Sequence, residues 1–452
     1  MTSSGRIFEH LRAEYETQWL SDIFVEPDNY PALLSYRSTL LFGAPGSGRT
    51  ALCKQLLHLS NADPNGPLVV EWQPSLMGAG RGKADLYFAT MNLIYDQIAR
   101  ALLQQIPRRP SAFLAAPDWV QETAAWFAQT HLTGNRRRFG ARLEETLDSE
   151  GIDVLRRLLN DDFEPALTPE SPDRMVIAEL ADLVQRLGWS GLWLLVDGLE
   201  SWLTSEVQEQ VDGLDNLLST LELFEIPRFS IKIFSPSSLE LMLMSCGGVL
   251  RDRLRVLRLA WRQEQLQQIA AKRVALATGQ KAVLLSDLYT QELILERLVE
   301  QGGGTPRGWL SLLRPVVDIY LGKGNRTLSE KEWESTQRGS IPPLRMDLRQ
   351  QRVYVGFRQI ENVQPSAYEL LSYLYQHPER KCSAKELYYR AYRKLEKIPA
   401  TENDSGWQPP SSWRSWYDTT LSRLRQAIEP NHRKPVYVVT VRGKGVELRN
   451  AL

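Results

Sequence analysis

GAPGSGRT, at residues 43–50, is the stretch from which the fold of this chain can be read. It follows an apolar run at residues 38–42 and precedes a helical pattern at residues 51–57. A strand, a glycine-rich turn and a helix in this order form the context of the phosphate-binding loop G-x-x-x-x-G-K-[ST], with Arg49 where lysine is usual. The stretch therefore predicts a nucleotide-binding loop. The alternative is a structural strand-to-helix turn that only resembles one.

The expected chemistry of this loop is that of a phosphate cradle. Its glycines let successive backbone N–H groups point into one concavity, and the helix that follows adds its positive N-terminal end. Thr50 is expected to place its hydroxyl on Mg²⁺, and Arg49 to reach the β- and γ-phosphates. A guanidinium is planar and forked where an ammonium is compact, so we expect ATP or ADP to bind and hydrolysis to be slow. The positions expected to hold the nucleotide here are Gly43, Gly46, Ser47, Gly48, Arg49 and Thr50.

Length and composition describe an ordinary globular protein of two to four domains. Of its 452 residues, 43% are hydrophobic and 24% are charged, and the net charge is zero, which argues against a chain that is basic throughout. The charge is uneven, however. Residues 341–452 hold 19 Lys and Arg against 11 Asp and Glu, a net charge of +8. This excess predicts an anionic partner for the C-terminal part.

Cysteine usage and hydropathy indicate a cytoplasmic protein. Cys53, Cys246 and Cys382 are few, odd in number and far apart, which predicts neither a disulfide framework nor a metal centre. The N-terminus lacks the apolar segment of a signal peptide, and no apolar run reaches the roughly 20 residues of a membrane span. We therefore expect no membrane association.

Further strands are expected at residues 66–72, 191–197 and 229–234. The second of these is a continuous apolar run that ends in Asp197, as expected for a buried parallel strand with chemistry at its tip. Asp197 is the expected Mg²⁺ partner of Thr50, and Glu200 would orient the attacking water. The alternative is a strand that simply ends in an Asp-Gly turn. Ser235, after the third strand, is expected to sense the γ-phosphate.

Helices are expected at residues 5–16, 85–105, 118–160, 175–187, 261–277 and 290–301, with a connector at residues 24–34. The basic run at residues 136–138 is interpreted as a solvated face. GTPRGWL, at residues 304–310, opens a further helix. Arg307 in this motif would swing onto the bound phosphate from a helical lid; the alternative is a surface arginine.

Strands alternating with helices predict a three-layer α/β domain. The arrangement resembles the P-loop ATPases of the STAND and AAA+ groups. GAPGSGRT is similar to their Walker A motif, LLVDGLE at residues 194–200 resembles a NACHT-type Walker B motif, and GTPRGWL resembles the sensor-2 arginine motif. The resemblance covers about residues 25–320. It departs at Arg49 and at Ser201, where a second acid is frequent, and both departures imply weak hydrolysis.

A different pattern begins after residues 321–343, which are polar and are interpreted as a linker. Short alternating segments predict small antiparallel strands at residues 344–361. Helices are expected at residues 365–376, from Ser383, whose partner in a capping box is Glu386, and at residues 413–428. Residues 398–412 are a Pro-rich insertion, and residues 435–448 predict a terminal hairpin.

Three helices and a terminal hairpin predict a winged helix-turn-helix, and the stretch resembles the DNA-binding domain of OmpR/PhoB-type response regulators. SRLRQAI at residues 422–428 resembles the end of their recognition helix, and VTVRGKGVEL at residues 439–448 resembles their wing. The resemblance covers nearly all of residues 344–449. Val446 departs from the usual aromatic residue, and a nucleotide site stands where a receiver domain would precede.

The resemblance places Arg423 at the base-reading position, where an arginine bonds guanine through two hydrogen bonds. Neighbouring turns would touch bases or phosphates, and the wing would touch phosphates or the minor groove. For Arg425 an internal ion pair that braces the domain is the alternative, and a domain that binds only protein is the alternative for the whole stretch. The expected DNA-binding residues are Arg414, Thr419, Ser422, Arg423, Arg425, Arg442 and Lys444.

The sequence as a whole predicts a nucleotide-controlled regulator of transcription that binds double-stranded DNA. ATP with Mg²⁺ would change its conformation or drive formation of a homo-oligomer, and a protein partner is left open. Two alternatives stand beside it: a DNA-stimulated ATPase of a defence or mobile-element system, and a scaffold with an inactive nucleotide site. The expected domains are an NTPase domain at 1–260, a helical lid at 261–320, a linker at 321–343 and a winged-helix domain at 344–452.

Overall fold

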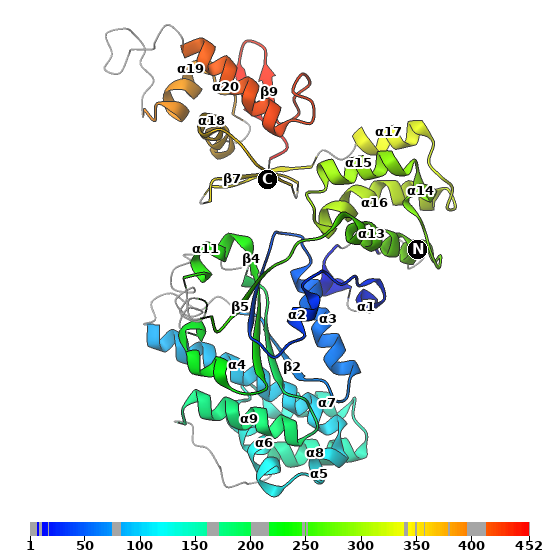
Figure 1. Ribbon diagram of the computed structural model, residues 1–452, viewed down its shortest axis with the longest axis vertical. Coiled ribbons are helices and arrows are strands. Elements are labelled where there is room, and N and C mark those ends of the chain that lie inside the picture. Colours follow the sequence, from blue (N-terminus) through cyan, green and yellow to red (C-terminus); the bar gives the residue numbers. More distant parts are fainter. Residues whose placement is uncertain are drawn as a thin grey trace. The chain divides into compact units, whose positions relative to one another are not determined.

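A computed structural model gives the arrangement of most of the chain (Figure 1). Two compact units are present, Arg12–Ala260, and Trp261–Leu452 together with Met1–Leu11, and each is described by itself. The residues that the structure describes are 7–8, 11–16, 18–74, 83–160, 171–199, 217–245, 249, 252–338, 342–348, 350–356, 358–377, 380–395 and 413–451.

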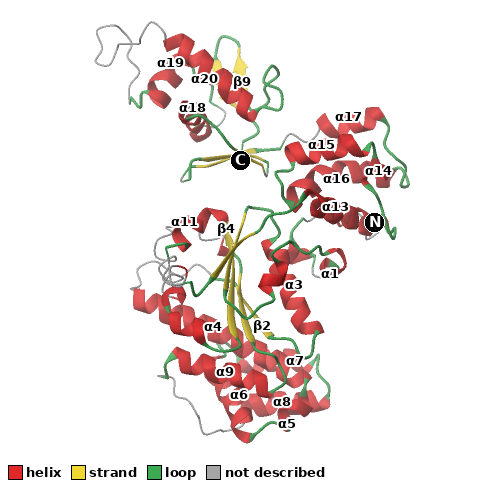
Figure 2. Cartoon of the chain, viewed as in Figure 1, coloured by secondary structure: helices red, strands yellow, loops and turns green. Residues whose placement is uncertain are grey.

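The Arg12–Ala260 unit is built on a parallel sheet of five strands with helices around it (Figures 1 and 2). Across the sheet the strand order is β2-β3-β4-β1-β5. The strands are β1 (Thr39–Gly43), β2 (Leu68–Trp72), β3 (Leu192–Val196), β4 (Phe229–Pro236) and β5 (Arg255–Arg258). The first four were expected from apolar runs and are confirmed. The run RVLR of β5 is short and charged, and it becomes a strand because it pairs along β1.

Strand order places β1 between two strands that come later in the chain, β4 and β5. After β1, the chain therefore forms β2, β3 and β4 on one side of β1. It then crosses to form β5 on the other side. In open parallel sheets, ligands bind at such a switch point, outside the carboxyl ends of the strands. The glycine-rich loop at residues 43–50 begins at this place.

Burial explains why these strands form. Every residue of β1, β3 and β4 is buried, as expected for parallel strands covered on both faces. On β2, Val70 and Trp72 join the core that also contains α4 (Lys83–Gln105), while Glu71 bonds Lys54 of α3 (Arg49–Ala62). Since neighbouring residues of a strand point to opposite faces, α3 and α4 cover opposite faces of β2. Each buried large apolar side chain contributes about 1.5–3 kcal/mol.

A helical layer separates β2 from β3 in the sequence. It contains α5 (Pro110–Leu114), α6 (Asp118–His131), α7 (Arg136–Glu144), α8 (Ser149–Asn160) and α9 (Asp173–Arg186). These confirm the helices expected after residue 118. The basic run at residues 136–138 begins α7 on the surface, where the Asn135 side chain caps the helix by accepting the Arg138 N–H at 3.0 Å.

The N-terminal segment differs from expectation. Instead of one helix over residues 5–16, the described residues there include a 3-10 turn, Ala13–Tyr15, and the expected connector holds α1 (Leu20–Ile23) and α2 (Tyr30–Leu33). These pieces are short because they are held by packing rather than by propensity: Leu20, Ile23, Tyr30 and Leu33 are buried.

The second unit begins with helices α13 (Gln263–Thr278), α14 (Leu285–Leu288), α15 (Gln291–Gln301), α16 (Pro306–Gly322) and α17 (Glu330–Arg338). Thr305 caps α16 by accepting the Gly308 N–H at 3.2 Å. At Gly308 a Cβ atom would lie 1.9 Å from the Gly302 carbonyl oxygen, so only glycine allows this close approach of the two segments.

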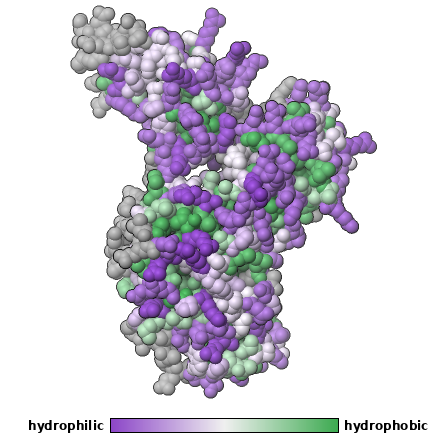
Figure 3. Space-filling model, viewed as in Figure 1, coloured by the Kyte–Doolittle hydropathy of each residue, from purple (hydrophilic) through white to green (hydrophobic). Residues whose placement is uncertain are grey.

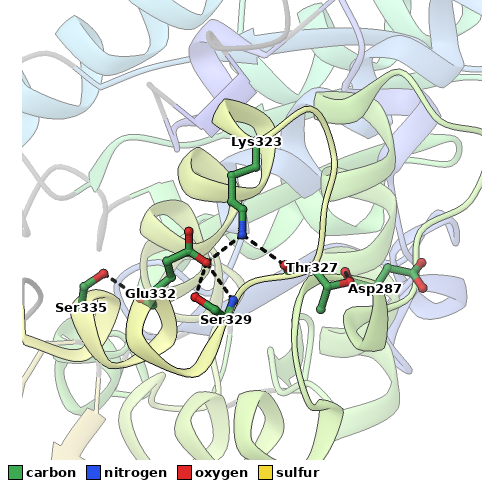
Figure 4. Close-up of polar contacts among 6 residues, drawn as sticks. All are labelled: Asp287, Lys323, Thr327, Ser329, Glu332 and Ser335. Atoms are coloured by element: carbon green, nitrogen blue, oxygen red, sulfur yellow. Dashed lines mark hydrogen bonds and ion pairs between the residues drawn. The ribbon is translucent and has the colours of Figure 1, made fainter.

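Helix α17 corrects the interpretation of residues 321–343 as a linker. The Glu332 carboxylate accepts the N–H and hydroxyl of Ser329 at 2.8 and 2.6 Å and the Lys323 ammonium at 2.8 Å (Figure 4). Trp333 is buried and stacks on Tyr289, with ring centroids 4.9 Å apart. Helix α17 is polar because its residues Glu330, Lys331, Glu334 and Ser335 face solvent. The capping-box spacing of Ser329 and Glu332 is the sequence signal that marks the start of this helix.

The described residues of the C-terminal part form a three-stranded antiparallel sheet, three helical segments and a hairpin. The strands are β6 (Leu344–Asp347), β7 (Arg352–Val355), β8 (Arg358–Ile360), β9 (Val438–Val441) and β10 (Gly445–Leu448). The helices are α18 (Pro365–Gln376), α19 (Ala384–Glu386), which continues as a π-helical turn over Leu387–Tyr392, and α20 (Trp413–Ile428). All were expected except the π-helical turn. One core contains residues from the sheet, from α18, from α20 and from the hairpin.

Two buried carboxylates organise this part. Glu429 accepts backbone N–H groups of Val436, Tyr437 and Val438 at 2.6–3.1 Å and so fixes the entry into the hairpin. Ser383 caps α19 as expected, by accepting the Glu386 N–H at 3.1 Å. The Glu386 carboxylate, however, accepts from the Tyr373 hydroxyl and Arg380 rather than completing the box.

Among the described residues, no helix combines the length and apolar character that a bilayer span requires. The face of the molecule visible in Figure 3 is largely hydrophilic, with hydrophobic residues in scattered groups.

Candidate nucleotide site and nucleic-acid interface

The loop between β1 and α3 has the backbone conformation of an anion cradle. Gly46 and Gly48 have φ angles of +80° and +96°, in the left-handed region that other residues adopt only with strain. Gly48 is the N-cap of α3, a helix of 14 residues, so the helix begins at Arg49. Its first N–H groups have no partners within the helix and carry the positive end of the helix dipole.

Gly43 marks how closely the loop folds over the end of β1. A Cβ atom there would lie 2.4 Å from the Ser47 hydroxyl oxygen and 3.0 Å from Cγ of Arg49. Both side chains are buried, with exposed fractions of 2% and 6%. The Arg49 side chain therefore lies back over the loop instead of extending into solvent. A glycine-lined concavity with a buried cation beside it fits a phosphate chain.

Asp197 directly follows β3, at the carboxyl end of the parallel strands, where the loop also begins. It is 3% exposed, and its N–H donates to the Trp72 carbonyl at 3.3 Å. Burial and then the charge of Asp197 raise the pKa of the Cys53 thiol on α3. Thr50 lies three residues before Cys53 and shares its side of the helix. The structure thus places Asp197 in the electrostatic environment of the α3 segment that carries Thr50.

A pair of residues near the carboxyl end of the sheet, Lys54 and Glu71, was not predicted from the sequence. The Lys54 ammonium on α3 donates to both carboxylate oxygens of Glu71, at 2.8 and 2.7 Å, and Gln73 donates to Glu71 at 2.8 Å. Burial lowers the pKa of Lys54, but the hydrogen bond and charge of Glu71, with Cys53 and Asp197, more than offset it, so the pKa is raised. Only the pairing of β2 with α3 brings Lys54 and Glu71 together, and no local pattern signals it.

Ser235 lies inside β4 rather than after it, in register with Phe42 of β1. It is fully buried, and its hydroxyl donates to the Pro236 carbonyl at 3.3 Å. Ser235 is therefore next to the start of the loop.

Glu200 and Ser201 lie outside the described residues, so the structure does not place the expected water-orienting acid. Arg307 is the second residue of α16 and belongs to the other unit, where its Nε donates to the Leu11 carbonyl at 3.1 Å. The described residues contain no cluster of three or more His, Cys, Asp or Glu side chains that would form a metal centre. Mg²⁺ held by one or two protein oxygens together with substrate phosphates needs no such cluster.

One face of α20 is polar and exposed. Buried Tyr417, Leu421 and Leu424 direct the helix onto the core, and the opposite face presents side chains at helical spacing. Arg414, 62% exposed, lies 3.6 Å from Asp418. The Arg423 guanidinium donates to the Gln364 side chain at 2.9 Å. The exposed residues of this face are Arg414, Ser415, Asp418, Thr419, Ser422, Arg423 and Gln426.

Arg425 points to the hairpin instead of joining that face. Its guanidinium donates to the Val438 carbonyl at 2.9 and 2.8 Å and to the Thr440 hydroxyl at 2.7 Å. Burial lowers the pKa of Arg425, while Glu429 acts in the opposite direction. The partners are hydrogen-bond acceptors on β9, so the bracing alternative describes this side chain, although through hydrogen bonds rather than an ion pair.

Arg442 and Lys444 are exposed in the turn between β9 and β10. Gly445 has a φ of +112°, and a Cβ atom there would lie 2.1 Å from the Cys382 carbonyl oxygen. Cys382 bonds Val446 through both backbone groups at 2.8 Å. Cys382 thus holds β10 of the hairpin, and Arg425 holds β9. The tip of the hairpin presents two cations, Arg442 and Lys444.

Sheet, loop and Asp197 together define an α/β protein with a glycine-rich loop between the first strand of a parallel sheet and the helix that follows. No protein-family model matches the chain, and no curated protein matches it.

The chain is similar to several solved structures at low scores. The ORC2 protein of Aeropyrum pernix in ADPNP–ADP complexes is 13% identical, with a TM-score of 0.36 over 97% of this chain and 90% of that chain. The ORC1 protein of Aeropyrum pernix in complex with DNA is 15% identical, with a TM-score of 0.36 over 96% and 93%. A Walker-type ATPase of Pyrococcus abyssi is 14% identical, with a TM-score of 0.34 over 97% and 93%. At such scores neither fold nor function of this chain rests on them.

Proposed function

We propose that this chain is a nucleotide-controlled DNA-binding protein that regulates transcription. The observation that carries the proposal is the presence, in one chain, of a buried-cation glycine loop near Asp197 and of a cationic helix-and-hairpin surface.

The nucleotide part of the proposal assigns roles to the loop and to Asp197. Backbone N–H groups of the loop between Gly46 and Thr50 would hold the phosphate chain of ATP or ADP, with the Arg49 guanidinium on the β- and γ-phosphates. Thr50 and Asp197 would hold Mg²⁺, which neutralises phosphate charge when bound. Ser235 would sense the γ-phosphate, Glu200 would orient water, and Arg307 would contribute from the lid.

A slow ATPase follows from Arg49. Phosphoryl transfer depends on positioned cations that match the developing charge, and a planar guanidinium held against Gly43 presents a different shape from an ammonium. The protein would therefore act as a switch, because slow hydrolysis would leave it bound to ATP for long periods. It would act by changing conformation or by forming a homo-oligomer.

The DNA part of the proposal takes the C-terminal part as a winged helix of the OmpR/PhoB type. Helix α20 would enter the major groove with Arg423 on guanine, and Arg414, Thr419 and Ser422 on nearby bases or phosphates. Arg442 and Lys444 at the hairpin tip would contact phosphates or the minor groove. Arg425 would keep the hairpin in position against α20.

The direct test is to denature the purified protein and to identify any released nucleotide by chromatography. We expect ADP or ATP from the wild type and none from a Thr50→Ala, Asp197→Ala double variant. Asp182→Ala is the matched control, since Asp182 is an exposed carboxylate on α9. DNA binding is then measured by fluorescence anisotropy with the same proteins.

Each result points to one function. No released nucleotide and no binding of added ATP with Mg²⁺ would reduce the first unit to a scaffold. Fast hydrolysis that DNA accelerates would favour a DNA-stimulated ATPase over a transcriptional switch.

A further inference from the structure

The outer edge of the parallel sheet at β2 carries backbone hydrogen-bonding groups that no described residue bonds. Among the described residues, strand β2 pairs with β3 and with no other strand. Leu68 donates its N–H to the Gly191 carbonyl at 2.8 Å, and the Trp72 carbonyl accepts from Asp197. Because the groups of alternate residues point to opposite sides of a strand, Leu68, Val70 and Trp72 bond β3. The N–H and C=O groups of Val69 and Glu71 therefore point outward.

A cavity of about 290 Å³ runs along this edge. Helix α3 contributes Leu57 to its wall, α4 contributes amide, guanidinium and methyl groups, and Trp189 lies at the end near Leu68. We call this cavity the β2 groove. Its lining consists of Leu57, Leu68, Val69, Val70, Glu71, Gln97, Arg100, Ala101, Gln104, Gln105 and Trp189.

The two edges of the sheet differ in how they are protected. Edge strand β5 carries Arg255 and Arg258, and charged side chains on an edge oppose pairing with another chain. The acid of β2, Glu71, is neutralised by Lys54 at 2.7 Å. Arg100 in the groove wall is similarly paired with Asp96 at 2.8 Å. The β2 edge thus presents backbone groups and side-chain amides, without an unbalanced charge to repel a strand.

We propose that the β2 groove binds an extended, uncharged polar segment of a partner polypeptide, which adds to the sheet as a strand beside β2. Backbone groups of the segment would bond Val69 and Glu71, whose spacing of two residues is the repeat of a strand. The exposed Gln104 amide of α4 would bond a polar side chain of the segment. The inference concerns a protein-binding site apart from the nucleotide loop, and it does not rest on the proposed function.

The probe is a phage-displayed library of short linear peptides selected on the full-length chain. Each enriched peptide is synthesised in two forms. One form carries N-methyl groups on its odd-numbered residues, and the other carries them on its even-numbered residues; these are the two registers. A strand that pairs along β2 turns the N–H groups of only alternate residues toward it. We therefore expect one register to weaken binding by about tenfold or more, as two lost backbone hydrogen bonds would, and the other to leave affinity unchanged.

Hydrogen exchange and a filled groove test the location. With peptide bound, the amides of Val69 and Glu71 should become protected from exchange. Ala101→Trp, which fills the groove, should abolish peptide binding, while Asn92→Trp, on an exposed position of the same helix, should not. Melting temperatures of both variants establish that they fold.

The N-methylation and exchange experiments use the wild type, so the proposal remains testable if Ala101→Trp does not fold. No enriched peptide, equal loss from both registers of N-methylation, or protection elsewhere than β2 would each overturn it.

Discussion

Arg49 is the residue at which the glycine loop departs from the usual phosphate-binding pattern. It occupies the lysine position of the loop, and it is buried over Gly43 rather than extended. The glycines that shape the backbone are unaffected by what stands at position 49. In the proposed nucleotide site, the loop would keep its phosphate-binding geometry, while the cation at position 49 would have a different shape.

Arg49→Lys is expected to raise the rate of ATP hydrolysis by about tenfold while ATP affinity changes little, since a compact ammonium follows the transferring phosphoryl group more closely. Single-turnover hydrolysis and equilibrium ATP binding measure the two effects separately. Arg49→Ala serves as the control and should weaken binding. An unchanged or lower rate in Arg49→Lys would show that Arg49 does not limit hydrolysis.

Lys232 is a second residue whose environment decides its chemistry. It is fully buried in β4, and its ammonium donates to the Ser35 carbonyl at 2.7 Å and the Ser230 hydroxyl at 3.2 Å. The Trp193 ring centroid lies 4.3 Å away. Burial, with a smaller effect of Arg255, lowers the pKa of Lys232 to about 7. In the run FSIKIF this lysine reads as an ordinary solvent-facing residue of a strand.

The free energy of unfolding should therefore depend on pH through Lys232. Between pH 7 and about 10 the unfolded chain, with an ordinary lysine pKa, binds the proton more tightly than the folded chain. Stability rises with pH over this window, by up to about 1.4 kcal/mol per pH unit from this residue. Lys232→Met should remove that slope in urea denaturation curves, and Lys281→Met, at an exposed position, should retain it. Parallel pH profiles of wild type and Lys232→Met would contradict the prediction.

At the scale of elements, α17 is held by polar contacts at its first turn. Hydrogen bonds from Lys323 and then from Ser329 lower the pKa of Glu332 to about 2. A carboxylate with a lowered pKa stabilises the fold at pH values above its unfolded pKa. That contribution is lost as the pH falls toward the folded value.

Glu332→Gln should mimic this loss at neutral pH. Hydrogen exchange of residues 330–338 is expected to be faster in Glu332→Gln than in the wild type, and wild-type exchange protection should itself fall as the pH decreases from about 4.5 toward 2. Glu330→Gln, an exposed acid two residues earlier on the same helix, should leave the segment protected. Equal protection in all three proteins would show that the Trp333 stack alone holds α17.

Helix α20 and its hairpin divide their arginines between surface and interior. Arg423 and Arg442 are exposed, whereas Arg425 bonds β9. Arg423→Ala should cost about 1–3 kcal/mol of DNA affinity and relax sequence preference at one position, while Lys444→Ala should weaken all sequences alike and reduce the salt dependence. Anisotropy titrations at several salt concentrations distinguish these effects. Arg345→Ala, an exposed arginine on β6, is the control that should change nothing.

Arg425→Ala would act through the hairpin. Faster hydrogen exchange in β9, together with weaker binding of every DNA sequence, is the expected pattern. Loss of affinity without any change in β9 exchange would instead make Arg425 a direct DNA contact.

For the whole molecule, the central prediction is coupling between nucleotide and DNA. DNA affinity is expected to differ between ATP-bound and ADP-bound protein by about 5- to 150-fold, the usual range of allosteric coupling. Asp197→Ala should abolish the difference but leave DNA binding itself intact. Linkage requires that DNA change ATP affinity by the same factor, so calorimetric ATP titrations with and without DNA check the result. Equal DNA affinity in both nucleotide states would separate the two halves into independent modules.

The parts of the fold that follow local rules were predicted from the sequence. Strands β1 to β4, helix α18, helix α20 and the hairpin were all placed, because periodicity and turn residues act within a few positions. Strand β5 was missed, since a short charged run becomes a strand only when β1 offers an edge. The polar composition of residues 330–338 favours a linker over a helix, and it outweighs the capping-box spacing of Ser329 and Glu332 that marks the start of α17.

Among the candidate site residues, the loop and Asp197 came from spacing and from the end of an apolar run. The Lys54–Glu71 pair did not, because residues on α3 and β2 meet only after the sheet has formed. For Arg425 the sequence allows two roles, DNA contact or internal bracing. Only the path of β9 past α20 decides that its guanidinium bonds the hairpin.

The sequence by itself determined the glycine loop, its strand and helix, and the separate basic C-terminal part, because backbone conformation and amphipathic pattern are encoded locally. Only the tertiary structure decided which charges are buried and which edges are open. Lys232 is buried because both faces of a parallel sheet are covered, and β2 lies at an edge of the described sheet because the strand order places it last. Both depend on contacts between segments far apart in the chain, which no local pattern contains.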